Sequence, residues 1–199
     1  MKATDPKPDL LVIGAGITGL SAACELADLG MRVEVVEATP APEPETCATL
    51  AAAGMLAPLA ETPTPGPFFD ACRQARDAWA PFAARLTVET GLDLDYDTRG
   101  ALMIDPLETY LEDMETAAQR LGEPTERIDH ATLVSFVPDV ADRIDGALHL
   151  PAEHRVDNQR VHQALRLAAK RRGIAIHYEH RVHRIDDARV EGDGWRRDA

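Results

Sequence analysis

The sequence is poor in cysteine and has no long apolar run. Its three cysteines, Cys24, Cys47 and Cys72, have the spacing of neither a metal knuckle nor a small disulfide scaffold. No apolar run approaches the roughly 18 residues that a membrane span requires. The polar stretch Met1–Asp9 contains two prolines and does not resemble a signal peptide. We therefore expect a cytoplasmic protein without a membrane span.

Basic residues are also scarce relative to acidic ones. There are 21 Lys and Arg against 34 Asp and Glu, a formal net charge of −13. A surface of that sign repels phosphates, so nucleic acid and anionic membranes are poor candidate partners. Only between Arg155 and Arg184 do basic residues outnumber acidic ones, and we interpret that stretch as a solvated helix face.

The N-terminal part has the pattern of a β-α-β unit. The apolar run Leu10–Ile13 predicts a strand buried on both faces. Apolar residues then recur at helical spacing from Thr18 to Leu29, Gly30 is placed to end the helix, and Met31–Glu37 predicts a second strand. A strand, helix and strand in this order predict a parallel crossover.

The rest of the chain mixes helices and strands. Alternate prolines predict an exposed loop at 39–46. In chain order we expect a helix at Phe68–Thr90, strands at Leu92–Tyr96 and Ala101–Ile104 joined by a turn at Asp97–Gly100, a helix capped by Asp105 and Pro106 and ending at Leu121, a strand at Gly146–Leu150, a helix from Asp157 to Gly173, strand material at Ile174–Ile185, and a polar tail.

A glycine motif links the first strand to the first helix. Gly14-Ala-Gly-Ile-Thr-Gly19 is a GxGxxG in which Gly14 makes the tight turn, Gly16 permits approach of a pyrophosphate, and Gly19 lets helix and strand pack. The helix N-terminus attracts phosphate, and Glu37 stands where a carboxylate accepts from ribose hydroxyls. The alternative is a purely structural turn with a surface glutamate. The motif itself does not separate NAD from FAD.

A second segment is small and apolar. Ala51-Ala-Ala-Gly-Met-Leu-Ala-Pro58 suits close backbone approach to a planar ligand, but its composition fits a tightly packed buried turn equally well.

Together, Gly14–Gly19, Glu37 and Ala51–Pro58 resemble the FAD-dependent oxidoreductases of the D-amino-acid oxidase type, and are most similar within them to the glycine oxidases of thiamine biosynthesis. The stretch Gly146–Asp157 and the helix after it also resemble that family, so the similarity covers essentially the whole chain. The resemblance implies FAD as the cofactor. It implies the following cofactor-binding residues: Gly14, Ala15, Gly16, Ile17, Thr18 and Gly19 at the pyrophosphate, Glu37 and Ala38 at the adenosine ribose, Ala48 and Thr49 beside the phosphates, Ala53, Gly54 and Met55 along the flavin, and Val182 at the adenine.

Two departures from the family pattern stand out. Leu50 lies near a position where the family often has serine, which removes one polar contact. The chain also ends at Ala199, before the family's next strand and its substrate-binding arginine. We therefore expect a truncated chain with an open sheet edge, and we assign no catalytic residue.

The predicted fold class is α/β, a Rossmann-like FAD/NAD(P)-binding domain with part of an inserted α+β substrate domain. We place the FAD-binding domain at residues 1–90 and 150–199 and the partial substrate domain at 91–149. The predicted function is a glycine oxidase-like oxidation of a small amino acid or amine, with oxygen or another electron acceptor. Sarcosine oxidase and D-amino-acid dehydrogenase activities are the nearest enzymatic alternatives.

The rival hypothesis is a non-catalytic FAD-binding fragment, or one subunit of a split oxidase completed by another chain or by a homo-oligomer. A metal site is not expected. The late histidines lack convergent spacing, because on an extended strand His177 and His183 would point one way and His180 the other.

Overall fold

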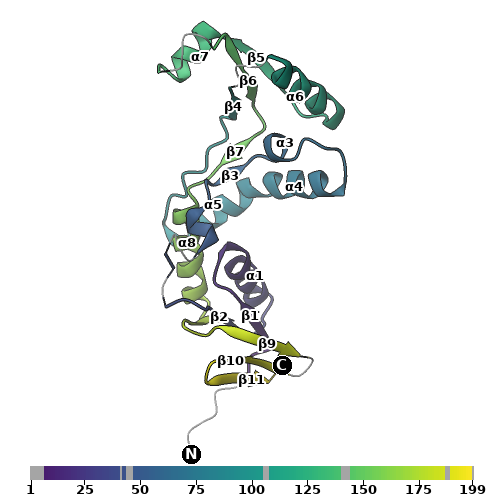
Figure 1. Cartoon of the computed structure of the whole chain (residues 1–199). Coiled ribbons are helices and arrows are strands. Elements are labelled where there is room, and N and C mark those ends of the chain that lie inside the picture. Colours follow the sequence, from purple (N-terminus) through teal and green to yellow (C-terminus); the bar gives the residue numbers. More distant parts are fainter. Residues whose placement is uncertain are drawn as a thin grey trace, which may run out of the picture. The chain divides into compact units, whose positions relative to one another are not determined.

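The computed structural model describes residues 7–40, 42–43, 47–104, 108–139, 144–186 and 189–198. The chain forms two compact units, whose elements are drawn in Figure 1. Unit 1 comprises Met1–Ala53, Arg85–Leu94 and Asn158–Ala199, and unit 2 comprises Gly54–Ala84 and Asp95–Asp157.

Unit 1 is built on a three-stranded parallel sheet in the order β1-β2-β8. Its strands are β1 (Leu10–Ile13), β2 (Val33–Val36) and β8 (Ala175–His177). The helices α1 (Ile17–Asp28) and α8 (Asn158–Arg171) pack against each other. The predicted parallel crossover and the helix after Asp157 are therefore confirmed.

The burial expected for β1 is wrong. β1 pairs with β2 alone among the described strands, its residues are only partly buried, and Ile13 is 48% exposed. β2 lies between β1 and β8 and buries Val33, Val35 and Val36. An apolar run indicates a strand, but its place in the sheet decides how much of it is buried.

Two further elements complete unit 1. The short helix α2 (Ala48–Ala51) follows the proline-rich segment 39–46, of which residues 41 and 44–46 lie outside the described residues. The predicted strand material at Ile174–Ile185 includes β8 and most of β9 (Val182–Asp186). The predicted polar tail is instead the strands β10 (Arg189–Gly192) and β11 (Trp195–Asp198), which form a three-stranded antiparallel sheet with β9. Gly194, with φ at +73°, makes the tight turn between β10 and β11.

Unit 2 is built on an antiparallel sheet in the order β4-β6-β5. Leu148 and Leu150 of β6 pack with α6 and with Leu59, while Ala147 packs with Leu133 of α7, so alternate residues of β6 serve two cores. The elements are β3 (Met55–Leu56), α3 (Pro58–Glu61), α4 (Pro67–Asp77), β4 (Ala101–Met103), α6 (Glu108–Leu121), β5 (Glu126–Asp129), α7 (His130–Phe136), β6 (Gly146–Leu150) and β7 (His154–Arg155).

The predicted helix Phe68–Thr90 is two helices, α4 and α5 (Trp79–Thr90), with a break at Ala78. Pro81 explains the break, because it has no N–H for the Asp77 carbonyl and its ring would clash with that carbonyl in a continuous helix. The predicted strand Leu92–Tyr96 is also wrong. Asp95 has φ of 50° and turns the backbone, and β4 pairs with β6 rather than with this segment.

The other expectations for this part of the chain are confirmed for β4, α6 and β6, with Gly122 ending α6 at φ +70°. The predicted cap at Asp105 and Pro106 lies outside the described residues.

Candidate cofactor-binding site

The glycine turn sits at the carboxyl end of β1. Gly14 has φ of +98°, which favours glycine, and its N–H donates to the Val36 carbonyl of β2 at 2.8 Å. A Cβ on Gly19 would lie 2.0 Å from the Gly14 carbonyl oxygen, so α1 starts against the turn itself. The two glycines allow the chain to reverse from β1 into α1 within a few residues.

Side chains from two segments distant in the sequence form hydrogen bonds with the N–H and with the carbonyl oxygen of Ala15. The Ala15 N–H donates to Glu37 Oε2 at 2.8 Å. The Ala15 carbonyl oxygen lies 2.9 Å from Nε2 of His162, a buried residue of α8. The turn is therefore fixed by side chains from β2 and α8 as well as by its glycines.

A second segment closes against the start of α1. Thr49 Oγ1 accepts from the Ile17 N–H at 3.0 Å, and Asn158 Nδ2 donates to the Thr49 carbonyl. A Cβ on Gly16 would lie 3.3 Å from Thr49 Oγ1. Asn158 and His162 are four residues apart and thus on one face of α8, so that face holds both α2 and the glycine turn.

Glu37 accepts several hydrogen bonds at the end of β2. Besides Ala15, the Thr39 N–H and hydroxyl donate to Oε1 at 3.1 and 3.2 Å. Burial acts to raise the pKa of Glu37, but the hydrogen bonds from Ala15 and Thr39 outweigh it and hold that pKa below its ordinary value. The carboxylate is therefore anionic at neutral pH.

These groups surround one cavity of about 170 Å³ in unit 1. That volume is smaller than the roughly 300–1,000 Å³ of whole ligand sites, so it suits one part of a dinucleotide. The cavity lies beyond the carboxyl ends of the parallel strands, where α/β sheets bind their ligands. Its lining residues are Ala15, Gly16, Glu37, Thr39, Pro42, Cys47, Ala48, Thr49, His162 and Tyr178.

The cavity fits an adenosine diphosphate group in two respects. α1 has no acidic residue in its first turn, so no side chain there competes with a phosphate at the positive end of the helix. The Tyr178 hydroxyl is buried and has no hydrogen-bond partner among the described residues. A polar ligand oxygen would satisfy it.

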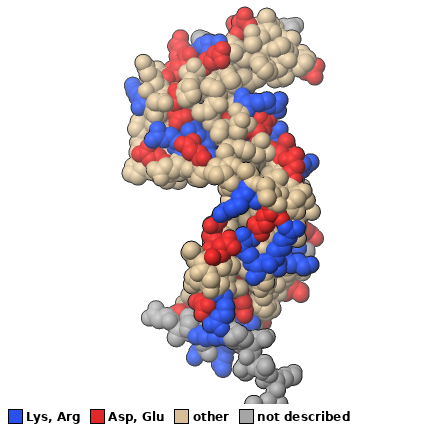
Figure 2. Space-filling view, turned by 180° about the vertical axis from the view of Figure 1, so that it is seen from behind, with Lys and Arg blue, Asp and Glu red and all other residues tan. Residues whose placement is uncertain are grey.

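A larger depression of about 920 Å³ also lies in unit 1, lined in part by Arg32, Arg172 and Arg197. It does not include the glycine turn, and these arginines already pair with carboxylates: Arg32 with Asp9, Arg172 with Asp28 and Glu89, and Arg197 with Glu34. Figure 2 likewise shows acidic and basic side chains next to one another. We therefore place the candidate site at the smaller cavity.

Five of the fourteen sequence-predicted site residues line this cavity, and five more adjoin them in the chain. Ala15, Gly16, Glu37, Ala48 and Thr49 line it. Gly14, Ile17, Thr18 and Gly19 belong to the adjoining turn and helix, and Ala38 follows Glu37. Ala53, Gly54, Met55 and Val182 are not among the lining residues; Gly54 and Met55 belong to unit 2, and Val182 begins β9.

Sequence reasoning missed five lining residues: Thr39, Pro42, Cys47, His162 and Tyr178. Tyr178 lies inside the stretch Ile174–Ile185 that the sequence predicts as strand, so nothing marked it as the residue that follows β8. His162 lies on the apolar face of an amphipathic helix, and no local motif identifies it as a site residue. The expected alternation of the late histidines is wrong, because the chain turns after Tyr178 and the rings of His177 and His180 lie 5.5 Å apart.

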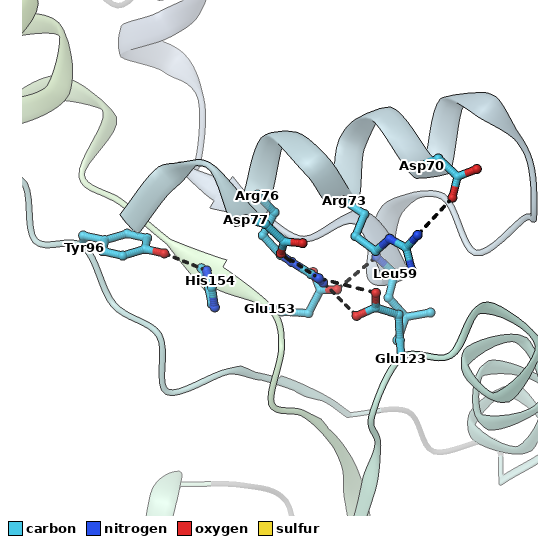
Figure 3. A network of polar contacts seen from close by, with 9 residues as sticks. All are labelled: Leu59, Asp70, Arg73, Arg76, Asp77, Tyr96, Glu123, Glu153 and His154. Atoms are coloured by element: carbon cyan, nitrogen blue, oxygen red, sulfur yellow. Dashed lines mark hydrogen bonds and ion pairs between the residues drawn. The ribbon is translucent and has the colours of Figure 1, made fainter. Parts of the chain in front are cut away.

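Unit 2 contains a separate network of buried polar side chains (Figure 3). Arg76 Nη1 donates to Glu123 Oε2 at 2.8 Å, and both side chains are almost fully buried. Glu153 is 1% exposed; its Oε1 accepts from the Leu59 N–H at 2.9 Å, and its Oε2 has no partner among the described residues. Burial raises the pKa of Glu153 to about 7, against the lowering effects of the Leu59 N–H and Arg76.

A parallel sheet, a glycine turn at the start of α1 and a carboxylate at the end of β2 define a dinucleotide-binding α/β domain. Residues 9–198 match the family model described as FAD dependent oxidoreductase. The chain belongs to this family, whose cofactor is FAD, and the predicted Rossmann-like α/β fold class is confirmed.

Individual relatives agree with that assignment. The chain is 32% identical over 168 residues to the bifunctional protein ThiO/ThiG of Synechocystis sp., covering 84% of this chain and 24% of that protein. It is 26% identical over 190 residues to the glycine oxidase of Geobacillus kaustophilus, covering 94% and 49%. The crystal structure of the glycine oxidase of Bacillus cereus superposes with a TM-score of 0.83 at 26% identity, covering 96% and 53%.

The chain thus spans about a quarter of the bifunctional relative and about half of the glycine oxidases. Among the helices that the structure describes, none is long and apolar enough to cross a bilayer.

Proposed function

We propose that unit 1 binds the adenosine diphosphate half of FAD, and that the chain is the flavin-binding part of an oxidase acting on a small amino acid or amine. The observation that carries the proposal is the convergence of the glycine turn, Glu37 and Thr49 on one cavity beyond a parallel sheet. Assigning unit 1 to the cofactor and unit 2 to the substrate is part of this proposal.

In this proposal, each side of the cavity binds a different part of the cofactor. The N-terminus of α1, with Gly16 and Thr49, faces the pyrophosphate, where the helix dipole and backbone N–H groups favour negative charge. The anionic Glu37 accepts from the ribose hydroxyls. His162 and Asn158 keep the two backbone segments in place.

Bound FAD would supply the hydride acceptor for the carbon beside the substrate's amino group. The protein's part is to orient the two molecules and to exclude water. No side chain of this chain is assigned as acid or base.

The substrate class rests on the relatives named glycine oxidase and ThiO/ThiG. We propose glycine or another small amino acid or amine as the substrate, oxygen or another compound as the electron acceptor, and thiamine biosynthesis as the setting. Because the chain spans only part of these relatives, a complementing chain or a homo-oligomer belongs to the same proposal.

The experiment is a visible absorption spectrum of the purified chain with added FAD, followed by oxygen uptake with glycine and with sarcosine. Flavin bands that stay with the protein after desalting would support cofactor binding, and oxygen uptake would support an oxidase. Flavin without turnover would favour the rival fragment or split enzyme. A folded chain that retains no FAD would contradict the proposal.

A further inference from the structure

Tyr178 occupies a position where α/β proteins meet their ligands. It follows the last residue of β8, at the same edge of the parallel sheet as the glycine turn and Glu37. The next residue, Glu179, has φ of 60°, so the chain turns there and does not continue as a strand. The turn leaves Tyr178 lining the cavity.

Backbone hydrogen bonds join Tyr178's neighbours to the segment that carries Glu37. The Glu37 N–H donates to the His177 carbonyl at 2.9 Å, and the His180 N–H donates to the Glu37 carbonyl at 2.8 Å. The Glu179 N–H donates to the Thr39 carbonyl at 3.2 Å. Tyr178 therefore belongs to the side of the cavity that we assign to adenosine ribose.

The Tyr178 hydroxyl is buried without a hydrogen-bond partner among the described residues. Leaving a buried polar group without a partner is unfavourable, because its desolvation is not compensated. The Arg166 guanidinium of α8 lies 5.9 Å from the centroid of the Tyr178 ring. Tyr178 lines the cavity, so a ligand oxygen that reaches its hydroxyl would satisfy it.

We propose that Tyr178 is a further cofactor-binding residue, whose hydroxyl hydrogen-bonds an oxygen of the adenosine diphosphate half of FAD. The inference rests on the proposed function and extends it, since neither the glycine motif nor the Ala51–Pro58 segment includes this residue. In this proposal the hydroxyl contacts only the adenosine diphosphate half, so it contributes to the affinity for FAD and ADP and not to the affinity for FMN.

The test compares Tyr178→Phe with wild type in titrations with FAD, ADP and FMN, followed by calorimetry or flavin fluorescence. The variant removes one oxygen atom and keeps the ring under Arg166. We expect its affinity for FAD and ADP to fall about three- to tenfold, while any affinity for FMN stays unchanged. The matched control is Tyr110→Phe, the same change at a 45% exposed tyrosine of unit 2, which should leave all three affinities unchanged.

Thermal unfolding without ligand provides a second readout. Removing an unpaired buried hydroxyl should leave the unfolding temperature of Tyr178→Phe unchanged or raise it. A lower unfolding temperature would mean that the hydroxyl bonds to the protein, and would overturn the inference. So would unchanged FAD affinity in Tyr178→Phe alongside a wild type that binds FAD. A wild type that binds neither FAD nor ADP would instead overturn the proposed function.

Discussion

Glu37 of unit 1 is partly buried and Glu153 of unit 2 is almost fully buried, and their surroundings have opposite effects on the pKa of the carboxyl group. Glu37 accepts from the Ala15 N–H and from Thr39, and its pKa is lowered. Among the described residues Glu153 accepts only from the Leu59 N–H, and burial raises its pKa to about 7. A carboxylate surrounded by donors at the open end of a sheet remains charged and available to a ligand. A carboxyl group enclosed in a core is a stability cost that depends on pH.

The largest effect should come from filling the approach to the phosphates. In Gly16→Val the Cβ would press on Thr49 Oγ1, and its methyl groups would occupy the space beside the turn. We expect FAD binding to be lost, as measured by flavin retention after desalting. Ala22→Val makes a similar addition on the exposed face of α1 and should bind FAD normally. A folded, yellow Gly16→Val protein would contradict the phosphate placement.

The second prediction concerns stability and pH in unit 2. The pKa of Glu153 is raised from its ordinary value of 4.5 to about 7 in the folded state. Between these two pH values the folded state therefore keeps a proton that the unfolded state has lost. Stability should therefore fall as pH rises from about 4.5 to 7. Charged groups facing Glu153 are Arg76 of α4, Glu123 after α6 and Glu61 of α3.

Glu153→Gln replaces the titratable carboxyl group with a neutral amide of nearly the same shape. Relative to wild type, we expect it to raise the free energy of unfolding at pH 8 by up to about 3 kcal/mol, and by little at pH 4.5. Urea titrations at the two pH values measure this difference. Glu112→Gln, at an exposed position of α6, should show no such pH dependence. Equal effects of Glu153→Gln at both pH values would mean that its proton is not the cause.

The third prediction concerns Glu37, the carboxylate of unit 1 that accepts several hydrogen bonds. Glu37→Ala removes the acceptor of the Ala15 N–H and the proposed ribose contact, so FAD affinity should fall about 10- to 100-fold. Glu34→Gln is the control on the same strand, since its carboxylate contacts His177 and Arg197 and does not line the cavity. Equal FAD affinity in Glu37→Ala and wild type would show that Glu37 does not contribute to FAD binding.

The smallest effect should come from His162, which acts through the backbone. His162→Phe leaves the Ala15 carbonyl oxygen without its donor, and FAD affinity should fall about three- to tenfold. His162→Gln retains an N–H donor and should recover part of the loss. If both variants bind FAD like wild type, the turn does not depend on α8.

The sequence predicts unit 1 well where the signals are local. The run Leu10–Ile13, the GxGxxG and the strand-forming stretch Met31–Glu37 are neighbours in the chain, so they specify the two strands, the turn and the helix directly. Sequence-based prediction fails where contacts with distant segments determine the local structure. Leu92–Tyr96 has strand composition, but β6 takes its place beside β4 and Asp95 bends the backbone.

The same distinction applies to the candidate site. Glu37 was predictable because its spacing from the glycines is a known pattern. His162 and Tyr178 reach the cavity through the packing of α8 and the turn after β8, and neither contact is encoded by a local motif. Pro81, by contrast, was a local signal for the break between α4 and α5 that the helical periodicity concealed.

The most direct test of the central claim is a binding titration of the wild-type chain with FAD and FMN, with ADP as a competitor. If unit 1 recognises the adenosine diphosphate half, FAD will bind more tightly than FMN, and ADP will displace it. Equal affinity for FAD and FMN, or FAD binding that ADP does not reduce, would contradict the assignment of the cavity at the glycine turn.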